Sequence, residues 1–185
     1  MPANVFATEA GQFLYGAHRY LSAARLLRFS ETWQTDPQLI HTPTLHLLAH
    51  GIELLLKYGL IVHGDSQAVV ARRYGHDLAL LWAAPANTEL RDLVLSQSET
   101  VWRIAQGSGQ YQDAFSGDPR QVLVDALSSL SALHSRETNF GLRYTLPPGT
   151  RAPRPAFLID AFGDIAEDLI IASGPNGLAV PGGLR

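Results

Sequence analysis

The segment PTLHLLAHGIELLLKYGLIVH, residues 43–63, decides the fold of this 185-residue chain. A narrow stripe of its polar side chains consists of His46, His50, Glu53 and Lys57. At about 100° per residue, all four fall within one sector of a helix roughly 60° wide, and mainly leucine and isoleucine cover the rest of the circumference. A helix on a protein surface has a much wider polar face. The segment is therefore predicted to be the central helix of a bundle with a single polar seam.

The remaining sequence indicates more helices and no sheet. Apolar residues recur at helical spacing, and cap-then-proline pairs mark helix starts at Thr42-Pro43 and Asp118-Pro119. The expected helical segments are residues 7–29, 43–63, 78–84, 88–106, 118–136 and 157–172, with a short helix or turn at 66–73. The polar stretch 30–41 is expected to connect two helices. The prediction is an all-α protein, a four- to five-helix up-and-down bundle with short additional helices.

Length and composition fit one helical domain at residues 1–172, followed by a flexible C-terminal tail at 173–185. Hydrophobic residues make up 46% of the chain and charged residues 17%, a balance that favours self-association through exposed apolar surface. The formal net charge of −3 provides no overall basic field, so nucleic-acid binding would need a local patch. Cysteine is absent, which excludes disulfides, thiolate metal sites and a cysteine nucleophile.

The segment 43–63 is long enough to cross a membrane, but two charged residues lie near its centre. Each of Glu53 and Lys57 would cost roughly 3 kcal/mol in a bilayer, so we do not expect the segment to span one. Residues 1–13 lack the basic and apolar regions of a signal peptide. These features predict a cytoplasmic protein without membrane contact.

The polar seam has three interpretations. In the first, Glu53 and Lys57 form a partly buried ion pair with the histidines hydrogen-bonded nearby, which is a structural role. In the second, the same groups line a pocket or a nucleic-acid groove, where burial favours the neutral forms of the histidines and of Lys57. In the third, the seam binds a metal ion.

The metal interpretation depends on a repeated spacing. His50-x-x-Glu53 recurs as His134-x-x-Glu137. Dinuclear sites in helical bundles use the opposite order, Glu-x-x-His, and need two further carboxylates. The last helix offers these as Asp164, Glu167 and Asp168. Because the order does not fit, we expect no metal and no cofactor.

The stretch 45–82 resembles the HEPN-like group of helical domains. Members of this group often carry an E-x-x-x-K pair on a core helix, then a glycine-containing turn, then a (G)HDL sequence that opens the next helix. The matching residues are Glu53, Lys57, Gly64, Gly75, His76, Asp77 and Leu78. The segment NFGLRYTLP, residues 139–147, is similar to an RYP-type segment of some members. Together the two stretches cover roughly a quarter of the chain.

The resemblance implies a bundle of four or five helices, often a homodimer, in a group of ribonuclease toxins, defence proteins and non-catalytic modules that handle nucleic acid or nucleotides. Catalytic members have an arginine and a histidine separated by four to six residues. Here Arg72 stands too close to His76, and His134 precedes Arg136, so the ribonuclease activity does not carry over. We expect a non-catalytic binding or regulatory domain that handles RNA or nucleotides as a homodimer. The alternative is a divergent nuclease or nucleotide-processing enzyme that uses the His/Glu/Lys stripe.

The candidate pocket combines the polar seam with residues of the two family-like stretches. Its members are His46, His50, Glu53, Lys57, His76, Asp77, Arg143 and Tyr144. Asp77 also stands where a helix N-cap belongs, so capping is its competing role. Arg143 and Tyr144 would bring a guanidinium and a phenol near the stripe to clamp a phosphate, or they pair with a carboxylate for structural reasons.

Two further expectations concern the outer helices. In the segment 118–136 the inward-facing residues are expected to be Val122, Ala126, Ser129, Leu130 and Leu133. In the segment 7–29 the three arginines, Arg19, Arg25 and Arg28, are expected to be solvated.

Overall fold

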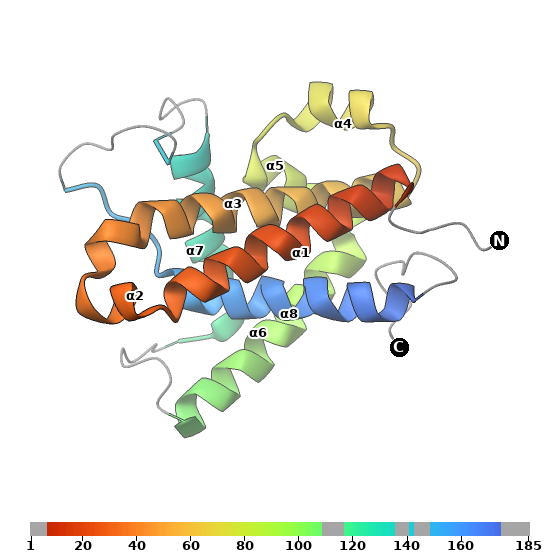
Figure 1. The fold of residues 1–185 in the computed structure, drawn as a ribbon. Helices are drawn as coiled ribbons and strands as arrows, with labels where there is room; N and C mark the ends of the chain where they lie inside the picture. Colours follow the sequence, from red (N-terminus) through yellow and green to blue (C-terminus); the bar gives the residue numbers. More distant parts are fainter. Residues whose placement is uncertain (1–6, 109–116, 136–140, 143–148, 175–185) are drawn as a thin grey trace.

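A computed structural model describes residues 7–108, 117–135, 141–142 and 149–174 of the chain. This part of the chain is helical and contains no strand, which confirms the predicted all-α class (Figure 1). Its elements are α1 (Glu9–Arg28), α2 (Glu31–Thr35), α3 (Pro37–Val62), α4 (Gln67–Tyr74), α5 (Leu78–Ala83), the 3-10 helix η2 (Pro85–Asn87), α6 (Thr88–Ser108), α7 (Pro119–His134) and α8 (Pro155–Ser173).

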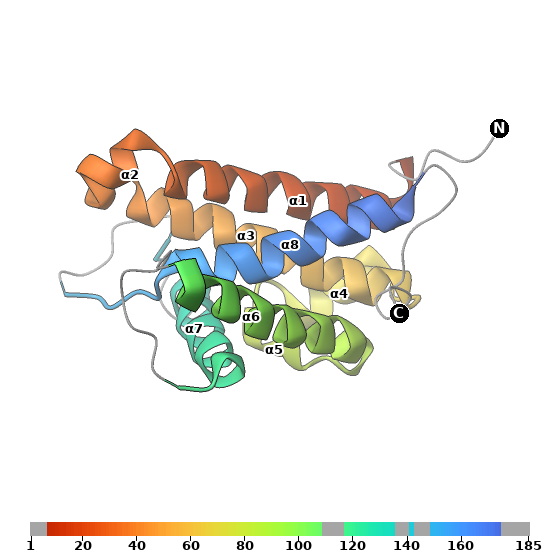
Figure 2. The same ribbon diagram turned by 90° about the horizontal axis from the view of Figure 1, so that it is seen from below.

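The apolar helix α3 lies at the centre, as the sequence predicts. Figure 1 shows α1 crossing it at a shallow angle with α8 alongside, and Figure 2 shows α5, α6 and α7 on the opposite side. Helix α1 packs against both α3 and α8, and α6 packs against both α8 and α7. Burial on several sides explains why so much of the circumference of α3 is apolar.

Glycines on α3 let two neighbours approach closely. A Cβ atom on Gly51 would lie 2.8 Å from the Cγ atom of Leu21, so the glycine allows α1 to pack directly on the α3 backbone. A Cβ atom on Gly59 would collide with Oδ1 of Asn87. The Asn87 amide is buried there and donates to the carbonyls of Leu56 and Leu81, at 3.0 and 2.9 Å. These contacts hold η2 against the core helix.

Helix α3 begins six residues earlier than predicted, and the stretch 30–41 is not a simple connection. Ser30 caps the short helix α2 by accepting a hydrogen bond from the Trp33 amide. Pro37 then occupies the first turn of α3, where its missing N–H costs nothing. Pro43 lies inside the helix rather than at its start. The Thr44 hydroxyl donates to the Ile40 carbonyl at 2.7 Å, one turn earlier in the helix.

The inward face of α7 agrees only in part with the expected one, since Leu130 and Leu133 are buried as predicted. Ser129 is exposed, and Val122 and Ala126 are only partly buried. The face that packs inward is instead formed by Leu123, Leu127, Leu130, Ser131, Leu133 and His134. Leu123 and Leu127 take the inward positions because their side chains bury more apolar surface than those of Val122 and Ala126. The observed orientation brings His134 into the core.

Among the described residues, α3 is the one helix long and apolar enough to cross a membrane by length and composition. However, 61% of its most apolar 18-residue stretch is buried inside the protein, as expected for a core helix. The cytoplasmic location stays a prediction. Helix α8 ends at Ser173, and residues 175–185 of the predicted tail lie outside the described residues.

Candidate functional site

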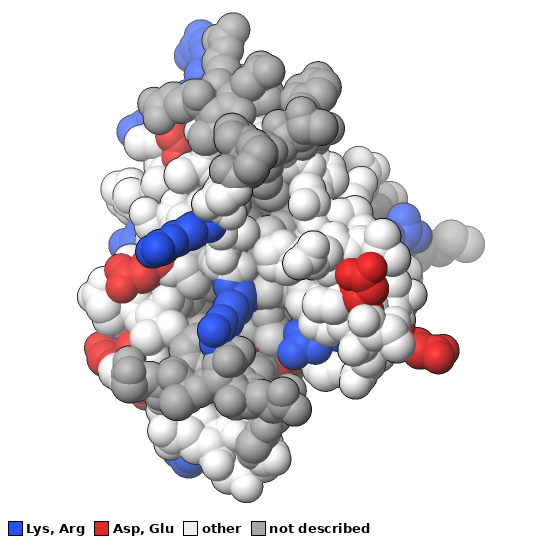
Figure 3. Space-filling view, turned by 90° about the vertical axis from the view of Figure 1, so that its left-hand side faces the viewer, with Lys and Arg blue, Asp and Glu red and all other residues white. Residues whose placement is uncertain are grey.

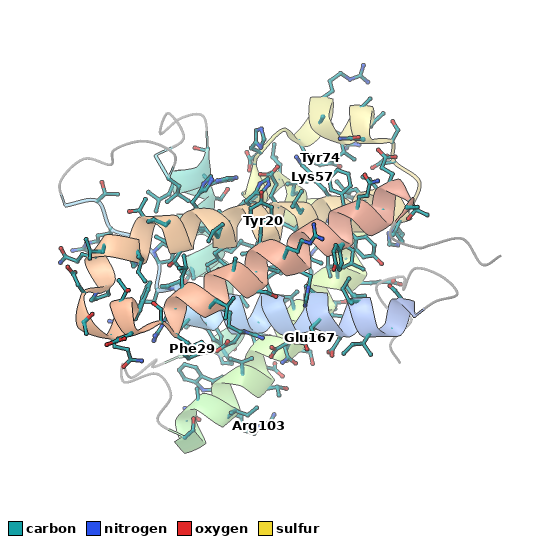
Figure 4. All side chains as sticks on the ribbon, in the orientation of Figure 1. Tyr20, Phe29, Lys57, Tyr74, Arg103 and Glu167 are labelled. Carbon is teal, nitrogen blue, oxygen red and sulfur yellow. The ribbon has the colours of Figure 1, made fainter. Side chains whose placement is uncertain are left out.

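The Glu53 carboxylate is the centre of a buried polar cluster in the middle of α3. Only 2% of its side chain is exposed. One turn later on the same helix, the Lys57 ammonium donates to Oε1 of Glu53 at 2.7 Å, and 11% of the Lys57 side chain is exposed. Figure 4 shows Lys57 on the side of α3 that faces α4, where Tyr74 also lies. The Glu53–Lys57 pair expected from the four-residue spacing is therefore formed and nearly closed to solvent.

His76 reaches the carboxylate from the turn between α4 and α5. Its Nδ1 lies 3.0 Å from Oε1 and 3.1 Å from Oε2 of Glu53, and 44% of its side chain is exposed. Two neighbours set its position. Gly75 adopts a φ of 55°, which ends α4 in a conformation that favours glycine. Asp77 accepts a hydrogen bond from the Leu80 amide at 3.0 Å and so caps α5.

His134 completes the enclosure from the end of α7. Its Nε2 lies 2.9 Å from Oε2 of Glu53, and only 1% of its side chain is exposed. This residue is absent from the pocket predicted from the sequence, and Glu137, its partner in the repeated spacing, lies outside the described residues. The signal that identifies His134 is its spacing: it follows Leu127 by seven residues and Leu130 by four, so it shares their buried face.

His50 and His46 lie at the margin of the cluster. The Nδ1 atom of His50 lies 3.7 Å from Oε2 of Glu53, an ion-pair distance, and 28% of the side chain is exposed. Tyr20 of α1 packs edge-on against the His50 ring at 4.4 Å between centroids. The ring of His46 lies 6.3 Å from that of His134. We call Glu53 with Lys57, His50, His76 and His134 the Glu53 cluster.

Opposing effects set the protonation state of Glu53. Burial alone would raise the pKa of its carboxyl group, because low-dielectric surroundings disfavour the charged form. The interactions with His134, His50 and Lys57 outweigh burial and hold the pKa well below its usual range. Glu53 is therefore ionised at any pH at which the protein is expected to work. A buried, permanently ionised carboxylate that already has several partners is a poor general base.

The other predicted site residues do not join the cluster in the described part of the chain. Arg143 and Tyr144 lie outside the described residues. Asp164 and Glu167, two of the three additional metal ligands that the sequence offers, instead contact Arg25 of α1 at 2.6 and 3.9 Å. Arg25, expected to be solvated, is thus an anchor between α1 and α8.

Arg25 organises a second polar cluster on the other side of the core. It includes Asp160 at 3.5 Å, and the Gln97 amide donates to Oδ2 of Asp164 at 2.8 Å. A hollow of about 270 Å³ lies beside it, lined by Arg25, Phe29, Val101, Ile104, Asp160 and Asp164. Figure 4 shows Phe29 and Glu167 on this side, away from Lys57. We call Arg25 with Gln97, Asp160, Asp164 and Glu167 the Arg25 cluster.

The described residues on the face where α3 begins do not form a large basic patch. Figure 3 shows the described lysines and arginines of this face separated from one another, with acidic groups among them and a largely uncharged surface between. Any recognition of an anion on this face would therefore rely on a few defined groups rather than on a broad field.

Comparison of the chain with protein-family models, with curated proteins and with solved structures finds no match.

Proposed function

We propose that the chain is a non-catalytic, HEPN-like binding domain that recognises a phosphate group of RNA or of a nucleotide at the exposed edge of the Glu53 cluster. The observation that carries this proposal is a division within the cluster. Glu53, Lys57 and His134 are closed against one another, whereas His50 and His76 keep 28% and 44% of their side chains exposed. The closed part holds the two exposed rings in place.

The chemistry of the exposed edge favours anions. Histidine ring N–H groups donate hydrogen bonds to phosphate oxygens. A single carboxylate faces three histidines and a lysine in this cluster. Tyr20, which packs on His50 and is itself partly exposed, offers an aromatic ring beside this edge.

The alternative of a divergent nuclease requires a group that can take up or release a proton during the reaction. Glu53 has a strongly lowered pKa, and Lys57 lies 2.7 Å from it in a nearly closed pair. Neither is available to a substrate without breaking a buried ion pair. An enzyme at this stripe would therefore have to use His50 and His76 as its acid and base, without the Glu53–Lys57 pair, and the binding proposal needs no such reaction.

We further propose that the chain forms a homodimer through the face beside the Arg25 cluster. Three large apolar side chains are exposed there: Leu26 at 75%, Phe29 at 52% and Ile104 at 59%. Phe29 and Ile104 line the same hollow, and Leu26 lies one turn before Phe29. Sedimentation velocity tests this: Ile104→Asp is expected to convert a dimer to a monomer, and a monomeric wild type would contradict the interface.

Binding and turnover of labelled RNA and of ATP test the main proposal. The wild-type chain is expected to bind without cleaving either probe, and His50→Ala and His76→Ala are each expected to weaken binding by about tenfold, the loss of one charge-assisted hydrogen bond. His63→Ala is the matched control, since His63 is an exposed histidine at the far end of the same core helix. Turnover that either His50→Ala or His76→Ala abolishes would favour the enzyme, and absence of binding to both probes would refute the proposal.

A further inference from the structure

We infer that Glu53, His76 and His134 form a site for one divalent transition-metal ion of the Zn²⁺ type, independently of any RNA or nucleotide. Their ligand atoms, a carboxylate oxygen, Nδ1 of His76 and Nε2 of His134, all lie within 4.8 Å of one another. They come from α3, from the α4–α5 turn and from the end of α7. Imidazole nitrogen and carboxylate oxygen are ligands that Zn²⁺ prefers.

The distances between these atoms are close to those of a coordination sphere. With metal–ligand bonds of about 2.1 Å, neighbouring ligand atoms stand about 3.0 Å apart in octahedral geometry and about 3.4 Å apart in tetrahedral geometry. His76 Nδ1 lies 3.0 and 3.1 Å from the two Glu53 oxygens, and His134 Nε2 lies 2.9 Å from Oε2. The separations from Glu53 to each histidine therefore already match a coordination sphere, and the two histidine nitrogens lie within 4.8 Å of each other.

The protonation state of His134 can change so that the ring binds a metal ion. Within the part of the chain that the structure describes, the buried Nδ1 of His134 has no hydrogen-bond partner. Moving the ring proton from Nε2 to Nδ1, which frees Nε2 to bind a metal, therefore breaks no hydrogen bond at Nδ1. The Nδ1 of His50 lies 3.7 Å from Oε2, outside the three-residue group, so water from the exposed side would complete the coordination of the ion.

Lys57 distinguishes the two oxygens of the carboxylate. Its ammonium contacts Oε1, whereas His134 contacts Oε2, so Oε2 is the ligand atom and Lys57 holds the carboxylate from outside the coordination sphere. The exposed fraction of His76 gives the ion a path from solvent, and the buried Glu53 and His134 form the floor. The acidic residues around Arg25 do not offer an equivalent site, because the guanidinium already occupies them.

Zinc titration of the full chain, after treatment with EDTA and dialysis, tests this inference. Isothermal titration and metal analysis after gel filtration are expected to give one Zn²⁺ per chain, with a higher Tm than the metal-free protein. Affinity is expected to rise from pH 6.0 to pH 7.5, because coordinating imidazoles must lose their protons. Co²⁺ in place of Zn²⁺ gives a visible absorption spectrum that reports its coordination directly.

Variants separate the site from adventitious binding. His76→Ala removes a half-exposed ligand and is expected to weaken Zn²⁺ binding by at least about tenfold while the metal-free protein keeps its helical circular-dichroism spectrum. His63→Ala is expected to leave binding unchanged. No bound Zn²⁺, or equal binding by wild type and His76→Ala, would overturn the inference. Zinc binding without RNA or nucleotide binding would support this inference and refute only the proposed function, and the reverse result would do the opposite.

Discussion

The Glu53 cluster and the Arg25 cluster are opposite solutions to placing charge between helices. In the first, one carboxylate is surrounded by a lysine and histidines, and only 2% of its side chain is exposed. In the second, one guanidinium is surrounded by carboxylates, with 32% of Arg25 and 35% of Asp164 exposed. Water can replace lost partners in the second cluster but not in the first. The two clusters therefore should differ sharply in what a single substitution costs.

The largest expected loss of stability comes from a substitution in the Glu53 cluster. Glu53→Ala leaves the Lys57 ammonium without its partner in a nearly closed space, and we expect a loss of about 3–5 kcal/mol in the free energy of unfolding. Urea denaturation followed by circular dichroism measures this loss. A loss below about 1 kcal/mol would mean that water reaches Lys57 and that the cluster is open.

Replacing both members of the buried pair sharpens the contrast. Glu53→Gln together with Lys57→Met removes both charges and keeps a hydrogen-bonding side chain beside His134. We expect the double variant to lose about 1–2 kcal/mol, less than Glu53→Ala alone, because no unpaired charge remains. If the double variant loses as much free energy of unfolding as Glu53→Gln and Lys57→Met lose together, the two residues are not energetically coupled.

A smaller loss of stability is expected from a substitution in the Arg25 cluster. Arg25→Met removes the contacts to Asp160 and Asp164 but leaves both carboxylates near solvent, so we expect a loss of about 1 kcal/mol or less. The same urea experiment at two ionic strengths provides a check, since an exposed pair weakens as salt is added. A loss of the size predicted for Glu53→Ala would remove the distinction between the clusters.

The smallest expected effect near neutral pH concerns the protonation of Glu53. Because the pKa of Glu53 is lowered in the folded state, its contribution to stability is complete above the unfolded-state pKa of about 4.3 and is lost as the pH falls towards the folded-state pKa. The stability difference between wild type and Glu53→Gln should therefore not shrink from pH 7 to pH 5. It should shrink only below about pH 4. Shrinkage already near pH 6 would contradict the lowered pKa.

The sequence predicted the polar seam because the helical period links residues four apart on one helix. Glu53 and Lys57 form the expected pair, and His50 lies within ion-pair distance. His76 could be associated with them only through the family-like order of motifs, because spacing along the chain says little about contacts between elements. The structure brings that histidine onto Glu53 across 23 residues.

Three features of the structure could not be predicted from helical spacing in the sequence. His134 was missed because it lies about 100° around α7 from the centre of the face predicted to point inward. Arg25 was expected to be solvated, because its carboxylate partners on α8 lie more than a hundred residues away in sequence. The start of α3 was placed at Pro43 because proline marks a helix start more often than a helix interior, yet Pro37 has that role.

Carboxyl carbon NMR of Glu53 tests the central claim, that this carboxylate is enclosed and permanently ionised, most directly. The side-chain carboxyl signal, assigned by comparison with Glu53→Gln, would be followed from pH 7 to pH 3. The account predicts no titration of this signal over that range while the exposed glutamates titrate normally. A Glu53 titration with a midpoint near or above the usual value for glutamate, about 4.3, would contradict it.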